Sequence, residues 1–404
     1  MGVMATSITS LGFASGLVCI GLFAAGEMGC AAIGGSATPK TASAAVTLSP
    51  VRRPHRPALY SLPHDARRVS TSSQLNAALA DGRQEAIVLA PGVYRNSEAF
   101  DDHEGDSIYA ARLGRVVLRA GISIGGNNTP PGARIRGLRF DISDPRKTLD
   151  GDAVHVWGSA SDAAVLDTSI DGHGVLEAGV VVHQPTGFVA RRVVARNFLD
   201  YGLVVDPNSV GFTTSHPYSL SDLSISQVSR KRPGSSNGTA EACLWLGSPG
   251  VVQRVSVRYC AISGIWTGTA MKHSRIQDAT IDDAPVGIYI EHFTTATTFQ
   301  RLRIGPSVTR GVNAEWANPA LGGKPASVDN VIQNAYFRTA HVGVYLDKGT
   351  TRTVVRHSVF AGQEWAAIGD YLGLDNRFYD NDFDRIAGSA VPVSTAHDPA
   401  GSGG

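Results

Sequence analysis

The chain has 404 residues, more than the roughly 250–300 at which a single globular core stops growing, so it has two domains or is a repeat fold. Its 36 Lys and Arg nearly balance 35 Asp and Glu, and this net charge of +1 does not favour non-specific binding to nucleic acid or acidic membranes. Four cysteines exclude a disulfide-stapled scaffold, and 45 glycines indicate many turns rather than long helices.

Residues 1–35 are predicted to be a secretory signal peptide. An apolar stretch with the length of a signal-peptide core, LGFASGLVCIGLFAA (11–25), is followed by small residues. The usual positive charge before this core is missing, because Lys40 is the first Lys or Arg. We therefore expect a secreted or cell-surface protein with no membrane span in its mature form. The alternatives are a lipid anchor at Cys30 and a single uncleaved membrane anchor.

Residues 36–70, rich in Ser, Pro, Ala and Arg, are predicted to be a disordered linker, and residues 396–404 a disordered tail. The body of the protein is expected over residues 71–395. It begins with SSQLNAALADG (72–82), a short amphipathic helix with a Ser cap, followed by EAIVLAPGVYRN (85–96), a buried strand and a turn. Such a helix would cover the first strand of the body, whose free edge would otherwise pair with another chain.

From about residue 164 a strand phrase recurs in which Gly is followed by an apolar, a variable and a second apolar residue. Its copies are GVVVH at Gly179, GLVVD at Gly202, GIWTG at Gly264, GIYIE at Gly287, GVNAE at Gly311 and GVYLD at Gly343. Gly179 and Gly202 are 23 residues apart, and Gly287 and Gly311 are 24 apart. Short strands at this period, without helical periodicity, predict an all-β fold: a single-stranded right-handed parallel β-helix with a short N-terminal capping helix. A leucine-rich repeat would need a missing Leu/Asn framework, and a β-propeller a longer repeat.

The phrase LNAAL…AIVLAPGVY, followed by these coils, resembles the pectate-lyase-like superfamily of right-handed parallel β-helices over about residues 70–395. That superfamily includes polysaccharide lyases, glycoside hydrolases, uronan epimerases, phage tailspikes and non-catalytic surface proteins. The resemblance therefore implies the fold and leaves the chemistry open.

Two columns of side chains are expected to point outward from the recurring strand, because alternate residues of a strand face opposite ways. The first column reads Val181, Val204, Trp266, Tyr289, Asn313 and Tyr345, and the second reads His183, Asp206, Gly268, Glu291, Glu315 and Asp347. Stacked coils place equivalent residues about 4.8 Å apart, so the last three carboxylates would repel one another. Such a costly cluster indicates a functional site, although carboxylates at strand ends also serve merely to solvate turns.

This patch is predicted to bind an extracellular polysaccharide in a groove walled by segments 207–217 and 316–326. Aromatic and amide groups would contact the sugar rings: Trp266, Tyr289, Asn313, Trp316 and Tyr345. For a glycosidase the catalytic carboxylates would be Glu291, Glu315 and Asp347. For a uronate lyase or epimerase, the base or the neutralising cation would come from His292, His341, Lys348 or Arg310. The carboxylates could hold Ca²⁺, and no Cys/His metal-ligand spacing occurs.

A rival site lies in LDGDAVHV (149–156) and IDGHGV (170–175), which place Asp150, Asp152, His155, Asp171 and His173 on neighbouring coils. Gly172-His173-Gly174 resembles the Gly-His-Gly element of polygalacturonase-like hydrolases. The Asn-Thr-Asp, Asp-Asp and Arg-x-Lys phrases of that family are missing at the expected spacing, so its catalytic roles are not carried over. The alternative is ordinary turn chemistry at coil corners.

The sequence thus predicts an exported protein that binds and cleaves a polysaccharide, by hydrolysis or β-elimination. The alternative is a non-catalytic, adhesin-like surface protein whose groove only binds glycans. Cys243 and Cys260 are 17 residues apart, which does not match the repeat period. They are not expected to stack, and we interpret them as buried apolar residues.

Overall fold

The computed structural model describes residues 61–125, 130–158, 160–183, 186–206, 217–228, 242–268, 271–291, 293–314, 327–390 and 392–393. The predicted signal peptide, Cys30 and the predicted tail at 396–404 lie outside these residues. The ordered body begins slightly earlier than expected, because Arg67–Val69 form β1 and pair with Ile87–Leu89.

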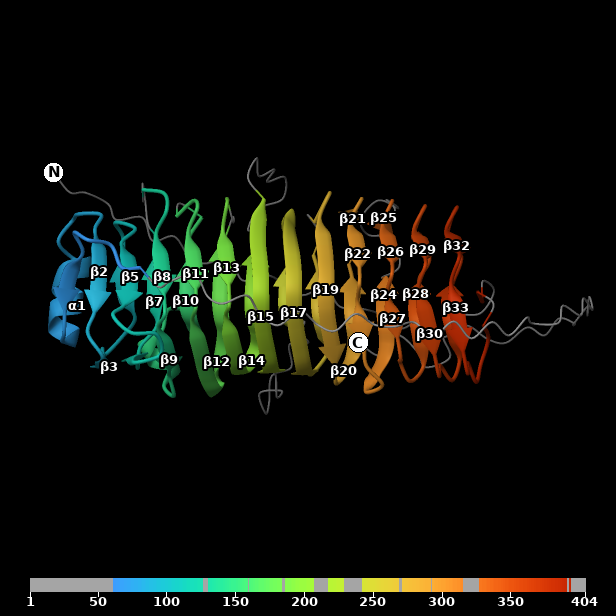
Figure 1. The fold of residues 1–404 in the computed structure, drawn as a ribbon, viewed down its shortest axis with the longest axis horizontal. Helices are drawn as coiled ribbons and strands as arrows, with labels where there is room; N and C mark the ends of the chain where they lie inside the picture. Colours follow the sequence, from blue (N-terminus) through green and yellow to red (C-terminus); the bar gives the residue numbers. More distant parts are fainter. Residues whose placement is uncertain are drawn as a thin grey trace, which may run out of the picture. The chain divides into compact units, whose positions relative to one another are not determined.

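The body is built from short parallel strands that stack in chain order (Figure 1). Every pairing between named strands in the described residues is parallel; for example, β12 pairs with β14, β14 with β16, and β16 with β18. The predicted single-stranded right-handed parallel β-helix is confirmed. The strands that precede the first long strand are β1 (Arg67–Val69), β2 (Ala86–Leu89), β3 (Gly92–Tyr94), β4 (Phe100–Asp102), β5 (Ser107–Ala110), β6 (Val116–Leu118), β7 (Ile122–Ile124), β8 (Arg134–Arg136), β9 (Arg139–Asp141), β10 (Asp152–Val156) and β11 (Ala164–Leu166).

The middle of the stack contains the longest strands, several of which pass through a coil corner without interruption. These are β12 (Ser169–His183), β13 (Val189–Arg191), β14 (Val194–Asp206), β15 (Tyr218–Val228), β16 (Ala242–Leu246), β17 (Gly250–Cys260), β18 (Ser263–Thr267), β19 (Arg275–Asp282) and β20 (Ala284–Ile290). The later coils contain β21 (Thr294–Thr295), β22 (Thr298–Gln300), β23 (Arg303–Ile304), β24 (Val308–Ala314), β25 (Ser327–Val328), β26 (Val331–Gln333), β27 (Tyr336–Phe337), β28 (Val342–Leu346), β29 (Val354–Arg356), β30 (Val359–Ala361), β31 (Ala366–Asp370), β32 (Arg377–Tyr379) and β33 (Asp382–Asp384).

Helix α1 (Ser72–Leu79) covers the first end of the stack, as predicted (Figure 1). Its N-cap is Thr71 rather than a Ser: the Thr71 hydroxyl accepts the backbone N–H of Gln74 at 3.2 Å. Leu75 and Leu79 point into the core, and the helix contacts β4. A 3-10 turn at Pro145–Lys147 is the other helical segment described. Neither of these segments is long and apolar enough to cross a bilayer.

The glycine of the recurring phrase is required by close packing between coils. A Cβ on Gly311 would lie 2.3 Å from the carbonyl oxygen of Gly343 and 2.6 Å from Cδ1 of Phe337. Phe337 itself stacks on Phe360 of the next coil, with ring centroids 4.9 Å apart. The apolar residues of the phrase fill the core around these rings, so the period of the phrase is the period of the coil.

Cys243 and Cys260 form a disulfide, with their Cα atoms 5.6 Å apart. Both side chains are buried, as expected, but they form a covalent bond, which the interpretation of them as buried apolar residues did not include. The pairing registers place Cys243 at the glycine position of its coil, between Gly202 and Gly264. Cys260 is the last residue of β17. The disulfide therefore links two parts of the chain across a corner and does not follow the stacking period.

Asp102 and Asp106 are buried carboxyl groups at the start of the stack. Asp102 accepts the backbone N–H groups of Glu104 at 3.1 Å and Gly105 at 2.9 Å, and Asp106 accepts that of Glu85 at 2.6 Å. Burial raises the pKa of Asp102 to about 6 and that of Asp106 to about 7, and a neighbouring carboxylate raises each further, Asp101 for Asp102 and Asp102 for Asp106.

Asp106 is expected to make the fold less stable as the pH rises. Its folded-state pKa of about 7 exceeds its ordinary value of 3.8, so the folded protein binds more protons than the unfolded chain between those values. The free energy of unfolding should therefore fall across that window. Asp106→Asn keeps the oxygen that accepts the Glu85 N–H but cannot ionise, so its fall should be smaller. Urea denaturation at either end of this pH window measures the free energy of unfolding. Asp382→Asn, on exposed β33, is the control. If the free energy of unfolding falls equally in Asp106→Asn and in the parent protein, the prediction is contradicted.

Candidate functional site

The first predicted outward column exists as a continuous line of paired residues. Val181 pairs with Val204, Trp266 with Tyr289, and Asn313 with Tyr345. The pairings also connect these segments to one another and extend the column toward the N-terminus. Through the named strands the column reads Asp101, Ser123, His155, Val181, Val204, Trp245, Trp266, Tyr289, Asn313, Tyr345 and Gly369.

The outward side of these strands is more covered than the sequence predicted, because its side chains pack on one another. Trp266 and Tyr289 are in ring contact, with centroids 4.5 Å apart, and both are half-buried. Tyr345 is only 3% exposed, because Trp365 and the Arg310 guanidinium lie against its ring. Tyr345 therefore supports its neighbours more than it presents a surface. We call this side the aromatic face, defined by Tyr201, Trp245, Trp266, Tyr289, Tyr345 and Trp365.

Two of the predicted carboxylates are described at the edge of the aromatic face. Glu291 follows β20, and Trp266 Nε1–H donates a hydrogen bond of 3.0 Å to its Oε2. Asp347 follows β28 and accepts the backbone N–H of Lys348 at 2.7 Å. Such a bond fits the role at a turn that the sequence offered as the alternative to catalysis. Their strands are two coils apart in register, so the backbones of the two residues lie about 9.6 Å apart.

The remaining predicted residues divide between described and undescribed segments. His341 stacks on Trp365 with centroids 5.4 Å apart, Arg310 lies over Tyr345 at 5.9 Å, and Lys348 follows Asp347 in the same turn. The structure therefore brings these three groups to the last coils of the aromatic face. Glu315, Trp316 and His292 lie outside the described residues, as do 207–216 and 315–326. The predicted groove walls and the Ca²⁺ site stay predictions, and the described residues contain no group of three or more metal-ligating side chains.

The residues of the rival site fall into two separate places. Asp152 and His155 lie on β10, where His155 continues the column of the aromatic face. His155 Nδ1–H donates to Asp152 at 2.8 Å, and Trp157 and His183 pack against the imidazole with centroids 4.5 and 4.9 Å away. Burial raises the pKa of Asp152 to about 6, against the lowering effect of His155. With His155 only 2% exposed, this pair is a buried support for the face.

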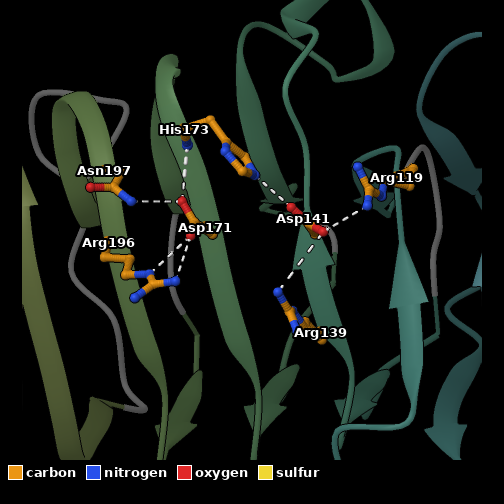
Figure 2. Close-up of polar contacts among 7 residues, drawn as sticks. All are labelled: Arg119, Arg139, Asp141, Asp171, His173, Arg196 and Asn197. Carbon is orange, nitrogen blue, oxygen red and sulfur yellow. Dashed lines mark hydrogen bonds and ion pairs between the residues drawn. The ribbon is translucent and has the colours of Figure 1, made fainter.

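Asp171 and His173 instead lie at a coil corner within β12 (Figure 2). The His173 backbone N–H donates to Asp171 at 3.1 Å, while its Nε2 hydrogen-bonds the Asp141 carboxylate. Burial alone would raise the pKa of Asp171, but hydrogen bonds from Asn197, the His173 backbone and Arg196 outweigh it and lower that pKa. Asp150 lies in the turn just before β10, close enough to Asp152 for its charge to raise the pKa of that residue.

The sequence did not predict several residues that belong to the aromatic face or to the corner that contains Asp171 and His173. Trp245 lies in ACLWLG (242–247), which follows the pattern of the strand phrase with Cys243 in place of the glycine, so its place in the column could have been inferred from the sequence. Tyr201 and Trp365 precede the phrase and had no signal, because their packing depends on the corner geometry. Asp141 was missed because it belongs to the coil before His173.

Two solved structures with a similar fold place the chain in a structural class. A catalytic domain of a GH87 α-1,3-glucanase in complex with nigerose aligns with a TM-score of 0.58 at 12% identity, covering 83% of this chain and 69% of that one. A PL6 family alginate lyase aligns with a TM-score of 0.53 at 14% identity, covering 83% of this chain and 58% of that one. No protein-family model matches the chain, and no curated protein matches it in sequence. The protein is thus a parallel β-helix protein that shares its fold with carbohydrate-active enzymes.

Proposed function

We propose that the protein is an exported, carbohydrate-active β-helix protein that binds a polysaccharide along the aromatic face and hydrolyses it there. The ring column carries this proposal: Trp245, Trp266 and Tyr289 occupy one register position on three successive coils. Rings repeated at about 4.8 Å along a rigid solenoid offer a row of flat apolar surfaces. Such a row suits the C–H faces of a linear chain of sugar units. Membership of the pectate-lyase-like superfamily is part of the same proposal.

The two solved neighbours support this proposal without deciding it. One is named as an α-1,3-glucanase and the other as an alginate lyase, so both are named for action on carbohydrates. Their low identity to this chain limits the likeness to the fold. The ligand class therefore rests on the chemistry of the aromatic face, and the two names agree with it.

Hydrolysis is favoured over β-elimination by the placement of Glu291 and Asp347. An inverting glycosidase holds its two carboxyl groups about 6.5–9.5 Å apart, leaving room for a water molecule. Two coils of backbone separate these residues by about 9.6 Å, and flexible side chains can shorten that distance. Each carboxylate accepts one N–H, Glu291 from Trp266 at 3.0 Å and Asp347 from Lys348 at 2.7 Å, so both are positioned by the protein. We assign Glu291 the part of the base and Asp347 that of the acid, an assignment that the pH profiles of their variants test.

An activity screen of the full chain tests the proposed function. Neutral and uronate polysaccharides, with and without Ca²⁺, are incubated with the protein, and both reducing ends and ultraviolet-absorbing unsaturated products are followed. New reducing ends without unsaturated products are expected. Unsaturated products would replace hydrolysis by β-elimination and move the chemistry to His341, Lys348 and Arg310. Binding without any product would support a glycan-binding surface protein.

Trp266→Ala is expected to weaken polysaccharide binding by about 5- to 30-fold, or roughly 1–2 kcal/mol, because a central aromatic contact is lost. Affinity electrophoresis in polysaccharide-containing gels measures the change. Tyr379→Ala is the matched control, since Tyr379 is an exposed aromatic residue of β32 on another side of the stack. Equal weakening in both variants would mean that the aromatic face is not the binding surface.

A further inference from the structure

An open pocket of about 840 Å³ lies at a corner of the stack, apart from the aromatic column. Its polar lining comes from five successive coils: His173, Asn197, Gln227, Tyr259 and Asp283. The rest of the lining is Gly174, Phe198, Leu199, Cys260 and Ala261. The pocket adjoins the start of the strands that carry the aromatic face, since Leu199 precedes Tyr201 and Ala261 precedes Ser263 by two residues each.

All five polar residues adopt a left-handed backbone conformation. Their φ angles are 53° for His173, 61° for Asn197, 56° for Gln227, 57° for Tyr259 and 56° for Asp283. This conformation is uncommon for residues other than Gly, Asn and Asp, and it costs about 1–3 kcal/mol for most side chains. Left-handed residues other than glycine occur at other corners of the stack as well, so what distinguishes this corner is what the side chains contact.

A second corner of the same stack shows what a purely structural column looks like. There, too, left-handed residues follow one another, and they pair through their charges: Arg192 with Asp167, Arg254 with Asp222, and Arg301 with Asp278. Each side chain has a partner in a neighbouring coil. At the pocket, by contrast, the side chains of Gln227 and Asp283 make no hydrogen bond or ion pair with any residue in the described part of the chain. Tyr259 is 50% exposed, with Arg258 against its ring.

The first two lining residues, His173 and Asn197, are held in place by a network of hydrogen bonds and ion pairs (Figure 2). Asp141 accepts hydrogen bonds from His173 Nε2–H and from Arg119, the latter at 3.0 Å. Asp171 accepts Asn197 Nδ2–H at 2.8 Å and Arg196 Nε–H at 2.9 Å. This leaves His173 Nδ1 and Asn197 Oδ1 for a ligand, at a site whose geometry is already fixed.

We propose that this corner pocket binds one unit of a neutral sugar, as a second carbohydrate site beside the aromatic face. The amides of Asn197 and Gln227 can both donate to and accept from sugar hydroxyls, and the Asp283 carboxylate can accept from two of them. The exposed Tyr259 ring offers an apolar surface for the opposite face of the sugar. A uronate is disfavoured, because the lining residues named above include the Asp283 carboxylate and no Lys or Arg. Only the choice of a carbohydrate as the ligand rests on the proposed function, and the inference does not require that the protein cleaves it.

Titration of the full chain with neutral glucose tetrasaccharides of several linkages, followed by calorimetry, tests the proposal. Asp283→Asn, which tolerates the left-handed backbone, and Tyr259→Ala should each weaken binding of the tetrasaccharide that binds best by about tenfold. Asp380→Asn is the matched control, because Asp380 is a left-handed corner residue with 66% side-chain exposure elsewhere in the stack. Thermal unfolding verifies that each variant is folded.

The Trp266→Ala variant separates this proposal from the proposed function. Tetrasaccharide binding that survives in Trp266→Ala and is lost in Asp283→Asn supports the pocket. Binding that is lost in Trp266→Ala and unchanged in Asp283→Asn and Tyr259→Ala overturns the pocket and leaves the aromatic face in place. Binding of tetragalacturonate in preference to every neutral tetrasaccharide also overturns the pocket proposal as stated.

Discussion

Glu291→Gln is expected to lower the rate of polysaccharide hydrolysis by about 10²–10⁴-fold, the usual contribution of a positioned general acid or base. Glutamine has nearly the same shape and can still accept the hydrogen bond that Trp266 Nε1–H donates at 3.0 Å. The change therefore removes the ionisable group while leaving the aromatic face packed. Reducing-end formation at saturating substrate, measured across the pH range, follows the rate.

The pH profile distinguishes a catalytic from a supporting role for Glu291. The parent protein should give a bell-shaped profile from one acid and one base, and Glu291→Gln should lose the acidic limb set by the base. Asp347→Asn should reduce the rate similarly, with loss of the alkaline limb. Asp382→Asn, a carboxylate change on exposed β33, serves as the control. A full rate in Glu291→Gln, with unchanged binding, would place the chemistry elsewhere.

The fold could be predicted because its main constraint repeats in the sequence. Gly311 has no space for a Cβ beside the next coil, and the same restriction at Gly287 and Gly343 produces a visible period. Alternation along each strand then fixes which residues face the core. One local motif thus determined the register of residues as far apart as Trp266, Asn313 and Tyr345.

The candidate site was harder to predict, because its exposure depends on residues outside the repeating phrase. Tyr345 was expected to be exposed, but Trp365 from the segment before the next strand covers it. His155 was assigned to a rival site, yet it continues the same column of paired residues. The corner pocket combines residues from five coils with irregular spacing, so periodicity gave no sign of it.

Removing the Cys243–Cys260 disulfide is expected to destabilise the fold by about 3 kcal/mol, the value for closing a loop of this length in the unfolded chain. The two cysteines enclose a sequence separation of 17 residues in the middle of the stack. The double variant Cys243→Ala/Cys260→Ala suits the test, because Cys243 stands at a glycine position where a small side chain is required. Urea denaturation of the parent and the variant, each with and without reductant, measures the difference.

Reductant provides the internal control for this prediction. It should bring the urea midpoint of the parent protein to that of the double variant and leave the midpoint of the variant unchanged. Equal midpoints for the oxidised parent and the variant would contradict the prediction.

The outcome also bears on the proposed export. A disulfide that stabilises the fold persists in oxidising compartments and is rare in the reducing cytosol. Stabilisation by this buried pair would therefore favour an exported protein, independently of any reasoning about residues 1–35.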